Sequence, residues 1–162
     1  MSDLTKFGNL CSALAAFSFQ FDVIVLSEVK IKSTFPVKLY NINGYNQFSS
    51  LRTERSGGGL LVFIKQEFAV EETPPTPNKF EKLNLSFKRA EMKMRMLAYY
   101  RAPSTNVKDF LEDLESEISS SDIKTFILGD ININTKDSAN NLRTDHTSLE
   151  YIELRQSYGY EV

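Results

Sequence analysis

The sequence has one cysteine, one histidine and no apolar run that approaches the roughly 20 residues a membrane span requires. A single cysteine excludes an internal disulfide and a zinc site made of several cysteines, and it fits a reducing compartment. The first residues include an acid, Asp3, and lack the basic segment of a signal peptide. We therefore expect an intracellular protein without a membrane-spanning segment.

An excess of positive charge is also lacking. The net charge is −2, which argues against a basic protein that coats nucleic acid. Any contact with nucleic acid must then be local or made through a metal ion. The 162 residues are 41% hydrophobic and 25% charged, which are ordinary values for a globular protein. The composition thus predicts one domain with a sizeable core, and it leaves the oligomeric state open.

The most informative stretch is residues 125–134. Its apolar residues 126–128 predict a buried strand, and Gly129 allows the backbone to turn sharply where the strand ends. Asp130 and Asn132 then stand at the carboxyl end of a strand, where open α/β sheets place their ligands. A carboxylate can bind a hard cation or orient a water, and an amide can donate to a phosphate oxygen. Taken alone, the stretch fits an ordinary tight turn equally well.

The rest of the chain alternates between helical and strand patterns. A second buried strand over residues 21–26 leads to Glu28, which by itself is most simply an acid that ends a strand. The strand over residues 92–98 alternates, which predicts one solvent-facing side, and it continues into Tyr100. We expect helices over residues 3–20, over 107–119 with Asn106 as its cap, and over 149–158, and further strands over residues 45–51, 60–64, 68–72 and 80–87.

A glycine-rich turn links two of these strands. Residues 57–59 are three glycines, but they precede a strand rather than a helix and lack the Gly-Lys-Ser or Gly-Lys-Thr ending of a nucleotide-binding loop. We therefore exclude nucleotide binding at this turn, which predicts a hairpin instead. Arg52 and Arg55 could contact a phosphate backbone, but a solvated turn is the favoured interpretation.

Four features follow one another along the chain. They are a strand that leads to Glu28, a hairpin with Arg-Ser-Gly-Gly-Gly at 55–59, a strand that ends in Tyr-Arg-Ala-Pro at 100–103, and Gly-Asp-Ile-Asn at 129–132. This series resembles the endonuclease/exonuclease/phosphatase superfamily, which includes DNase I and the AP endonucleases, and it is most similar to the branch encoded by non-LTR retrotransposons. The resemblance implies a DNase I-like four-layer α/β sandwich with mixed, largely antiparallel sheets over residues 1–162.

The resemblance also implies a function and residue roles. It implies a divalent-metal-dependent endonuclease acting on DNA, with Mg²⁺ or Mn²⁺ as cofactor, in the nucleus if the source is eukaryotic. Glu28 matches the glutamate that binds the metal, and Asp130 matches the aspartate that orients or activates the attacking water. Asn132 and Tyr100 match residues that contact the scissile phosphate. Tyr99 is the neighbouring candidate, but Tyr100 has the better spacing to the proline segment. Such groups suit phosphodiester hydrolysis.

The chain departs from the family pattern at both ends. The family's first strand carries an active-site asparagine and would precede the first helix, inside which Asn9 is a poor substitute. The family's closing Ser-Asp-His would lie well beyond residue 162. The triplet at residues 144–146, Thr-Asp-His, looks similar but comes too early, and we interpret it as the start of the last helix. A Ser-His-Asp hydrolase using His146 finds no nucleophile-elbow motif.

These departures predict an incomplete domain with an exposed sheet edge that is weakly active or inactive as given. Two alternatives to a DNA endonuclease remain. One is a phosphatase of the same superfamily that acts on small phosphorylated substrates, and the retrotransposon-like motifs argue against it. The other is a non-catalytic binding module that kept the fold. The truncated ends favour this module, whereas the presence of Glu28, Asp130 and Asn132 opposes it.

Overall fold

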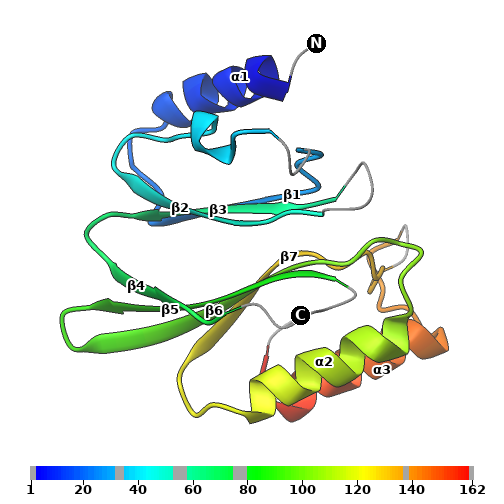
Figure 1. The fold of residues 1–162 in the computed structure, drawn as a ribbon. Coiled ribbons are helices and arrows are strands. Elements are labelled where there is room, and N and C mark those ends of the chain that lie inside the picture. Colours follow the sequence, from blue (N-terminus) through cyan, green and yellow to red (C-terminus); the bar gives the residue numbers. More distant parts are fainter. Residues whose placement is uncertain (1–2, 32–34, 53–57, 75–79, 137–138, 161–162) are drawn as a thin grey trace. The chain divides into compact units, whose positions relative to one another are not determined.

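The structure is a computed structural model in which residues 3–31, 35–52, 58–74, 80–136 and 139–160 are described. It divides into two compact units (Figure 1). The first unit consists of Met1–Tyr100 with Lys124–Asp130, and the second consists of Arg101–Ile123 with Ile131–Val162. Arg55, for which a solvated turn was predicted, lies outside the described residues.

Two β-sheets that pack face to face form the first unit (Figure 1). One sheet is antiparallel and has the order β1-β3-β2, and the other has the order β4-β5-β6-β7. The second sheet is mixed, because β7 runs parallel to β6 whereas the other pairs are antiparallel. The elements are α1 (Asp3–Ala15), β1 (Val23–Ser27), the 3₁₀ turn η1 (Val37–Leu39), β2 (Tyr45–Ser50), β3 (Leu60–Lys65), β4 (Ala69–Glu72), β5 (Glu81–Arg89), β6 (Met92–Tyr100) and β7 (Thr125–Asp130).

β3 is the most deeply buried strand of its sheet. Its residues 60–64 are at most 1% exposed, as expected for an unbroken apolar run covered on both faces. Leu61 and Phe63 lie in a core cluster with Tyr40, and Phe7 of α1 packs against that cluster. The helix therefore covers one face of the antiparallel sheet, and the other face meets the mixed sheet.

The first helix is shorter than predicted. α1 ends at Ala15, although the apolar spacing predicts a helix to residue 20. Beyond the helix, Phe17, Phe19 and Phe21 contact one another through their rings, with centroids 4.9–5.6 Å apart. Side chains two residues apart do not face each other on a helix, so these contacts require a different backbone. Their mutual packing accounts for the early end of α1.

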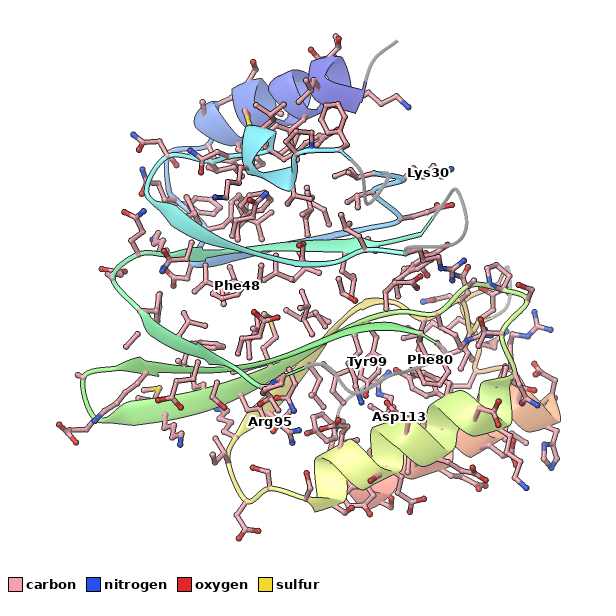
Figure 2. All side chains as sticks on the ribbon, viewed as in Figure 1. Lys30, Phe48, Phe80, Arg95, Tyr99 and Asp113 are labelled. Carbon is pink, nitrogen blue, oxygen red and sulfur yellow. The ribbon has the colours of Figure 1, made fainter. Side chains whose placement is uncertain are left out.

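The prediction of one solvent-facing side for β6 holds only at its beginning. Met92 is exposed, but every residue from Arg95 to Tyr100 is buried. β6 is an inner strand with β5 on one side and β7 on the other, and parallel pairs are typically covered on both faces. The buried charge of Arg95 is accommodated because its Nε donates to Asn84 Oδ1 on β5 at 3.0 Å. Figure 2 shows Arg95 among the side chains of the mixed sheet.

The prediction that the Gly-Asp-Ile-Asn strand is buried is wrong. β7 lies at the edge of the mixed sheet, and its side chains Phe126 and Leu128 are 41% and 42% exposed. The sequence pattern identifies the strand, but burial depends on whether a further strand lies beside it, and the described residues include none. Within the described part of the chain, β7 is thus an edge strand of the mixed sheet.

Gly129 permits the close approach of β7 to β6. Its φ is +127°, and it lies opposite Tyr99 in the strand register. A Cβ at this position would overlap the Tyr99 carbonyl oxygen and lie 2.9 Å from the carbonyl carbon. Glycine is therefore required here for the close approach to β6, whereas the sharp turn predicted at Gly129 is wrong, because the strand continues through Asp130.

Two helices in mutual contact dominate the second unit, α2 (Val107–Ser119) and α3 (His146–Ser157). The bounds of α2 agree with the prediction, and Asn106 caps it by accepting a hydrogen bond from Lys108 N at 2.8 Å. Its side chains Phe110, Leu114 and Ile118 form the buried stripe. In the described part of the chain, no helix combines the length and apolar character needed to cross a bilayer.

Asp145 caps α3, which begins at His146, earlier than the predicted start at residue 149. The Asp145 carboxylate accepts bonds from Ser148 N at 3.2 Å, Ser148 Oγ at 2.8 Å and Arg143 Nε at 2.8 Å. The bond from the Ser148 hydroxyl and the Arg143 guanidinium lower the pKa of Asp145 to about 2. His146 is exposed, and its Nδ1 lies 3.2 Å from Glu150 Oε2. The triplet at 144–146 is therefore a helix start.

Gly129→Ala should lower the free energy of unfolding by about 3 kcal/mol, because the new Cβ collides with the backbone of β6 rather than with a flexible side chain. Chemical denaturation followed by circular dichroism measures the loss. Gly44→Ala is the matched control. It also has a positive φ, +85°, but nothing lies within 4 Å of its added Cβ, so only the backbone strain of about 1 kcal/mol is expected. Equal losses in the two variants would contradict the steric explanation.

Asp145→Ala should lower the melting temperature near neutral pH, because α3 loses its N-cap. The loss should shrink as the pH falls below about 4 toward 2. A depressed pKa means that the stabilisation is present above the unfolded-state value of 3.8 and disappears as the pH drops through the folded-state value of about 2. Thermal melts at several pH values test this. Asp145→Asn keeps a capping oxygen but not the charge. At neutral pH its melting temperature should lie between those of the wild type and Asp145→Ala. A loss independent of pH would refute the ionic contribution.

Candidate functional site

Three strands of the first unit end with the residues that the sequence singles out. Glu28 directly follows β1, Tyr100 is the last residue of β6, and Asp130 is the last residue of β7. In the register of the mixed sheet, Tyr100 lies opposite Glu81 on β5 and opposite Asp130 on β7. Opposite residues on neighbouring strands point to the same face of a sheet. Glu81, Tyr100 and Asp130 therefore form one lateral row.

The electrostatics of Tyr100 show which charges lie around this row. The side chain is 4% exposed, and burial is the largest cause of its raised pKa. The carboxylates of Glu28, Glu81 and Asp130 raise the pKa further, whereas Arg52 lowers it. Glu28 and Asp130 thus act on the same hydroxyl group, which stays protonated at neutral pH and can donate a hydrogen bond.

Tyr99 points to the opposite face of the mixed sheet. It lies opposite Lys82 and Gly129 in the register, one residue out of step with the row that contains Tyr100. Its ring is fully buried, and Lys82 Nζ lies 5.9 Å from the ring centroid. Figure 2 labels Tyr99 on the ribbon. Of the two tyrosines, only Tyr100 shares a face with Asp130.

The backbone at Glu28 is strained. Its φ is +55°, and Lys30 has the same value, in the left-handed region that costs a non-glycine residue about 1 kcal/mol. The glycine-rich hairpin holds this segment, because Val29 N donates to Gly59 O at 3.3 Å and Lys30 N donates to Gly58 O at 2.9 Å. Lys30 Nζ lies 3.3 Å from Glu28 Oε1. Strained residues of this kind gather at functional sites.

An ion pair that the sequence pattern does not reveal lies beside Tyr100. Arg52 donates from Nε to Glu81 Oε1 and from Nη2 to Oε2 at 3.3 Å, and Glu81 is only 5% exposed. Arg52 Cζ lies 5.9 Å from the Tyr100 ring centroid. The interpretation of Arg52 as part of a solvated turn is therefore wrong. No sequence motif surrounds Glu81, the first residue of β5. Only its position in the strand register, opposite Tyr100, identifies it as a residue of this group.

Gly58 lies against the same group. A Cβ added to it would stand 3.0 Å from Arg52 Nε, from Glu81 Oε1 and from Tyr100 Cε1. Its φ of +78° also favours glycine. Gly58 thus allows close packing next to the ion pair.

Asn132, the fourth predicted site residue, belongs to the second unit. Its φ is +52°, which asparagine tolerates better than most residues. Its Nδ2 donates to Arg101 O at 2.8 Å, and Arg101 Nη2 donates to Asn132 O at 2.7 Å. Asn132 follows Asp130 by two positions in the sequence. Arg101, which sequence reasoning noted only as part of a motif, is thus bonded directly to a candidate site residue.

The residues near Tyr100 include two carboxylates, those of Glu28 and Asp130. Among the described residues, no three His, Cys, Asp or Glu side chains form a group that could hold an ion by themselves. Mg²⁺ and Mn²⁺ prefer hard oxygen ligands, and Mg²⁺ commonly uses one or two carboxylates and retains several waters. Two partly exposed carboxylates near one hydroxyl fit such an ion. A pocket of about 300 Å³, lined by residues of α1 and β1, includes Glu28 and Lys30 in its wall.

No protein-family model and no curated protein matches the sequence. Solved structures do match. The AP endonuclease LMAP from Leishmania major has a TM-score of 0.70 at 14% identity, over 96% of this chain and 63% of that one. The endonuclease domain of TRAS1, a telomere-specific non-LTR retrotransposon, has a TM-score of 0.65 at 13% identity, over 97% and 65%.

A third match is TDP2 from D. rerio, complexed with a single-strand DNA product, with a TM-score of 0.56 at 16% identity over 83% of this chain and 56% of that one. The chain therefore spans less than two thirds of the length of each of these proteins. The agreement extends over nearly the whole chain, and at these identities it establishes the fold. The chain has the α/β fold of these endonucleases, which confirms the fold class expected from its motifs.

Proposed function

We propose that the chain is a divalent-metal-dependent phosphodiesterase domain of the endonuclease type, with DNA as its substrate. The observation that carries the proposal is the convergence of Glu28, Tyr100 and Asp130 at the ends of three strands. These groups come from β1, β6 and β7, so the fold brings them together rather than the sequence. The DNase I-like fold supports a nuclease or phosphodiesterase of this kind.

Glu28 is the residue that would hold the metal ion. It is partly exposed, it stands in a strained segment held by Gly58 and Gly59, and its carboxylate provides the hard oxygen that Mg²⁺ or Mn²⁺ prefers. Lys30 must release the carboxylate for metal to bind. A bound divalent ion would neutralise charge that develops on the phosphoryl oxygens.

Asp130, Tyr100 and Asn132 have complementary roles in this proposal. The Asp130 carboxylate accepts a hydrogen bond from the attacking water and so orients it. The Tyr100 hydroxyl, whose raised pKa keeps its proton in place, donates to a phosphoryl oxygen. The Asn132 carboxamide donates to the same phosphate.

DNA is the proposed substrate because of the neighbours in structure. They are an AP endonuclease, a retrotransposon endonuclease domain and a TDP2 with a single-strand DNA product. With a net charge of −2, the chain would bind a phosphate backbone through local contacts and the metal ion. A DNA substrate would place the protein in the nucleus of a eukaryotic cell.

A second candidate is a non-catalytic binding module with the same fold. The ion pair between Lys30 and Glu28, at 3.3 Å, favours it, since this lysine occupies the carboxylate that would bind metal. The pair is exposed on both sides, however, and such pairs contribute little free energy and exchange readily. The two candidates therefore differ in whether a divalent ion displaces Lys30.

The first test is nicking of supercoiled plasmid DNA. The wild type should nick slowly in the presence of Mg²⁺, and Asp130→Asn should lower the rate at least about a hundredfold, because a neutral amide oxygen accepts a proton from the attacking water far less readily than a carboxylate does. Asp122→Asn, an exposed carboxylate just before β7, is the matched control and should nick like the wild type. Equal rates for wild type and Asp130→Asn would refute the assignment, and no nicking with either Mg²⁺ or Mn²⁺ would favour the binding module.

The second test measures metal binding directly. Titration calorimetry with Mg²⁺ and Mn²⁺ should show one site whose affinity falls at least about tenfold in Glu28→Gln, because the amide carries no charge for the ion. Glu72→Gln, on the exposed strand β4, is the control and should bind like the wild type. Affinity that is the same in wild type and Glu28→Gln would contradict the metal assignment.

A further inference from the structure

Among the described residues of the second unit, Arg101 is the one buried charged side chain, and the proposed function assigns it no role. It directly follows Tyr100, the last residue of β6, and is 2% exposed. Burial of a guanidinium is unfavourable unless its N–H groups are hydrogen-bonded. The bonds that compensate its burial therefore indicate which segments the residue joins.

The guanidinium donates to backbone carbonyl oxygens on both sides. Nε donates to Ile131 O at 2.7 Å and Nη2 donates to Asn132 O at 2.7 Å. Nη1 donates to Thr105 O at 2.6 Å and to Ala102 O at 3.3 Å. A planar guanidinium serves several acceptors in one fixed geometry, which the ammonium group of lysine does not reproduce. Arg101 thus fastens the segment after β7 to the segment after β6.

These bonds begin where strand pairing stops. Tyr100 and Asp130 are the last paired residues of β6 and β7. Beyond them, the carbonyl groups of the half-buried Ile131 and the exposed Asn132 lie outside the strand pairing. The Arg101 side chain donates to both carbonyl groups and so joins the segment after β6 to the segment after β7.

Asn132 in turn donates a hydrogen bond to Arg101. Its Nδ2 donates to Arg101 O at 2.8 Å, while its own carbonyl accepts from Arg101 Nη2. The reciprocal bonds fix the backbone of Asn132, with its φ of +52°, and the plane of its carboxamide. Because an amide nitrogen carries two hydrogens, fixing one toward Arg101 O determines the direction of the other.

We propose that Arg101 is a positioning residue for Asn132, which holds the carboxamide in the orientation that donates to a phosphoryl oxygen. The proposal rests on the proposed function, since that contact with phosphate is part of it. A small rotation of the carboxamide would turn the donor away, and misplacements of about 1 Å are known to lower rates about a hundredfold.

The test compares Arg101→Lys with Arg95→Lys. Both variants keep the positive charge and remove the planar group of a buried arginine. Arg95 is 5% exposed, donates to Asn84 Oδ1, and lies opposite Thr125, at the far end of β7 from Asp130. The Arg95 variant therefore reports the effect of a destabilised core alone.

Two measurements are made on both variants. Hydrogen exchange of the Asn132 side-chain amide, followed by NMR with ¹⁵N-labelled asparagine, should be at least about tenfold faster in Arg101→Lys than in Arg95→Lys. Plasmid nicking should show a kcat about 10–100-fold lower in Arg101→Lys at unchanged KM, and a change below about twofold in Arg95→Lys. Equal exchange in the two variants, or faster exchange with no separate loss of kcat, would overturn the proposal.

The exchange measurement keeps this proposal distinct from the proposed function. If the wild type does not nick DNA, the proposed function fails, and the exchange rates still decide whether Arg101 positions Asn132. If Arg101→Lys does not fold, hydrogen exchange of the Asn132 side-chain amide in the wild type tests the proposal. Protection of the Asn132 amide to the same degree as Arg101 Nε–H supports the proposal, and exchange as fast as that of the exposed Asn9 side chain overturns it.

Discussion

The parallel pairing of β7 with β6 is the constraint on which the site depends. It places Asp130 opposite Tyr100, and the antiparallel pairing of β5 with β6 places Glu81 opposite Tyr100 from the other side. The pairing requires glycine at 129, because any Cβ there would overlap the backbone at Tyr99. One backbone requirement thus fixes the row of polar side chains on one face of the sheet.

Negative charge is concentrated around that row, and the carboxylates differ in how far they are buried. The most buried of the carboxylates, Glu81, is bound by Arg52, so its charge is compensated where solvent cannot reach it. Glu28 and Asp130 are partly exposed, where a hydrated ion can approach. The left-handed backbone at Glu28 and Asn132 places strain next to the strand ends rather than within the sheets.

Predictions that depend on interactions between residues close in sequence were accurate, and predictions that depend on distant segments were less so. α2 and its Asn106 cap agreed because helix periodicity and capping are local properties. Burial was harder to predict. β7 has the apolar residues of an inner strand but lies at an edge, and β6 has an alternating pattern but is buried on both faces from Arg95 onward. The burial of both strands depends on which strands lie beside them, and a strand's own sequence does not specify its neighbours.

The sequence by itself determined the strand ends that carry Glu28, Tyr100 and Asp130, the glycine at 129 and the fold to which these belong, because each depends on a few adjacent residues. Only the tertiary structure decided how the ends meet and which residues support them. Arg52 binds Glu81 across 29 residues of sequence, and Arg101 reaches Ile131 across 30. Such bonds depend on strand register and burial, which arise only when distant segments pack together.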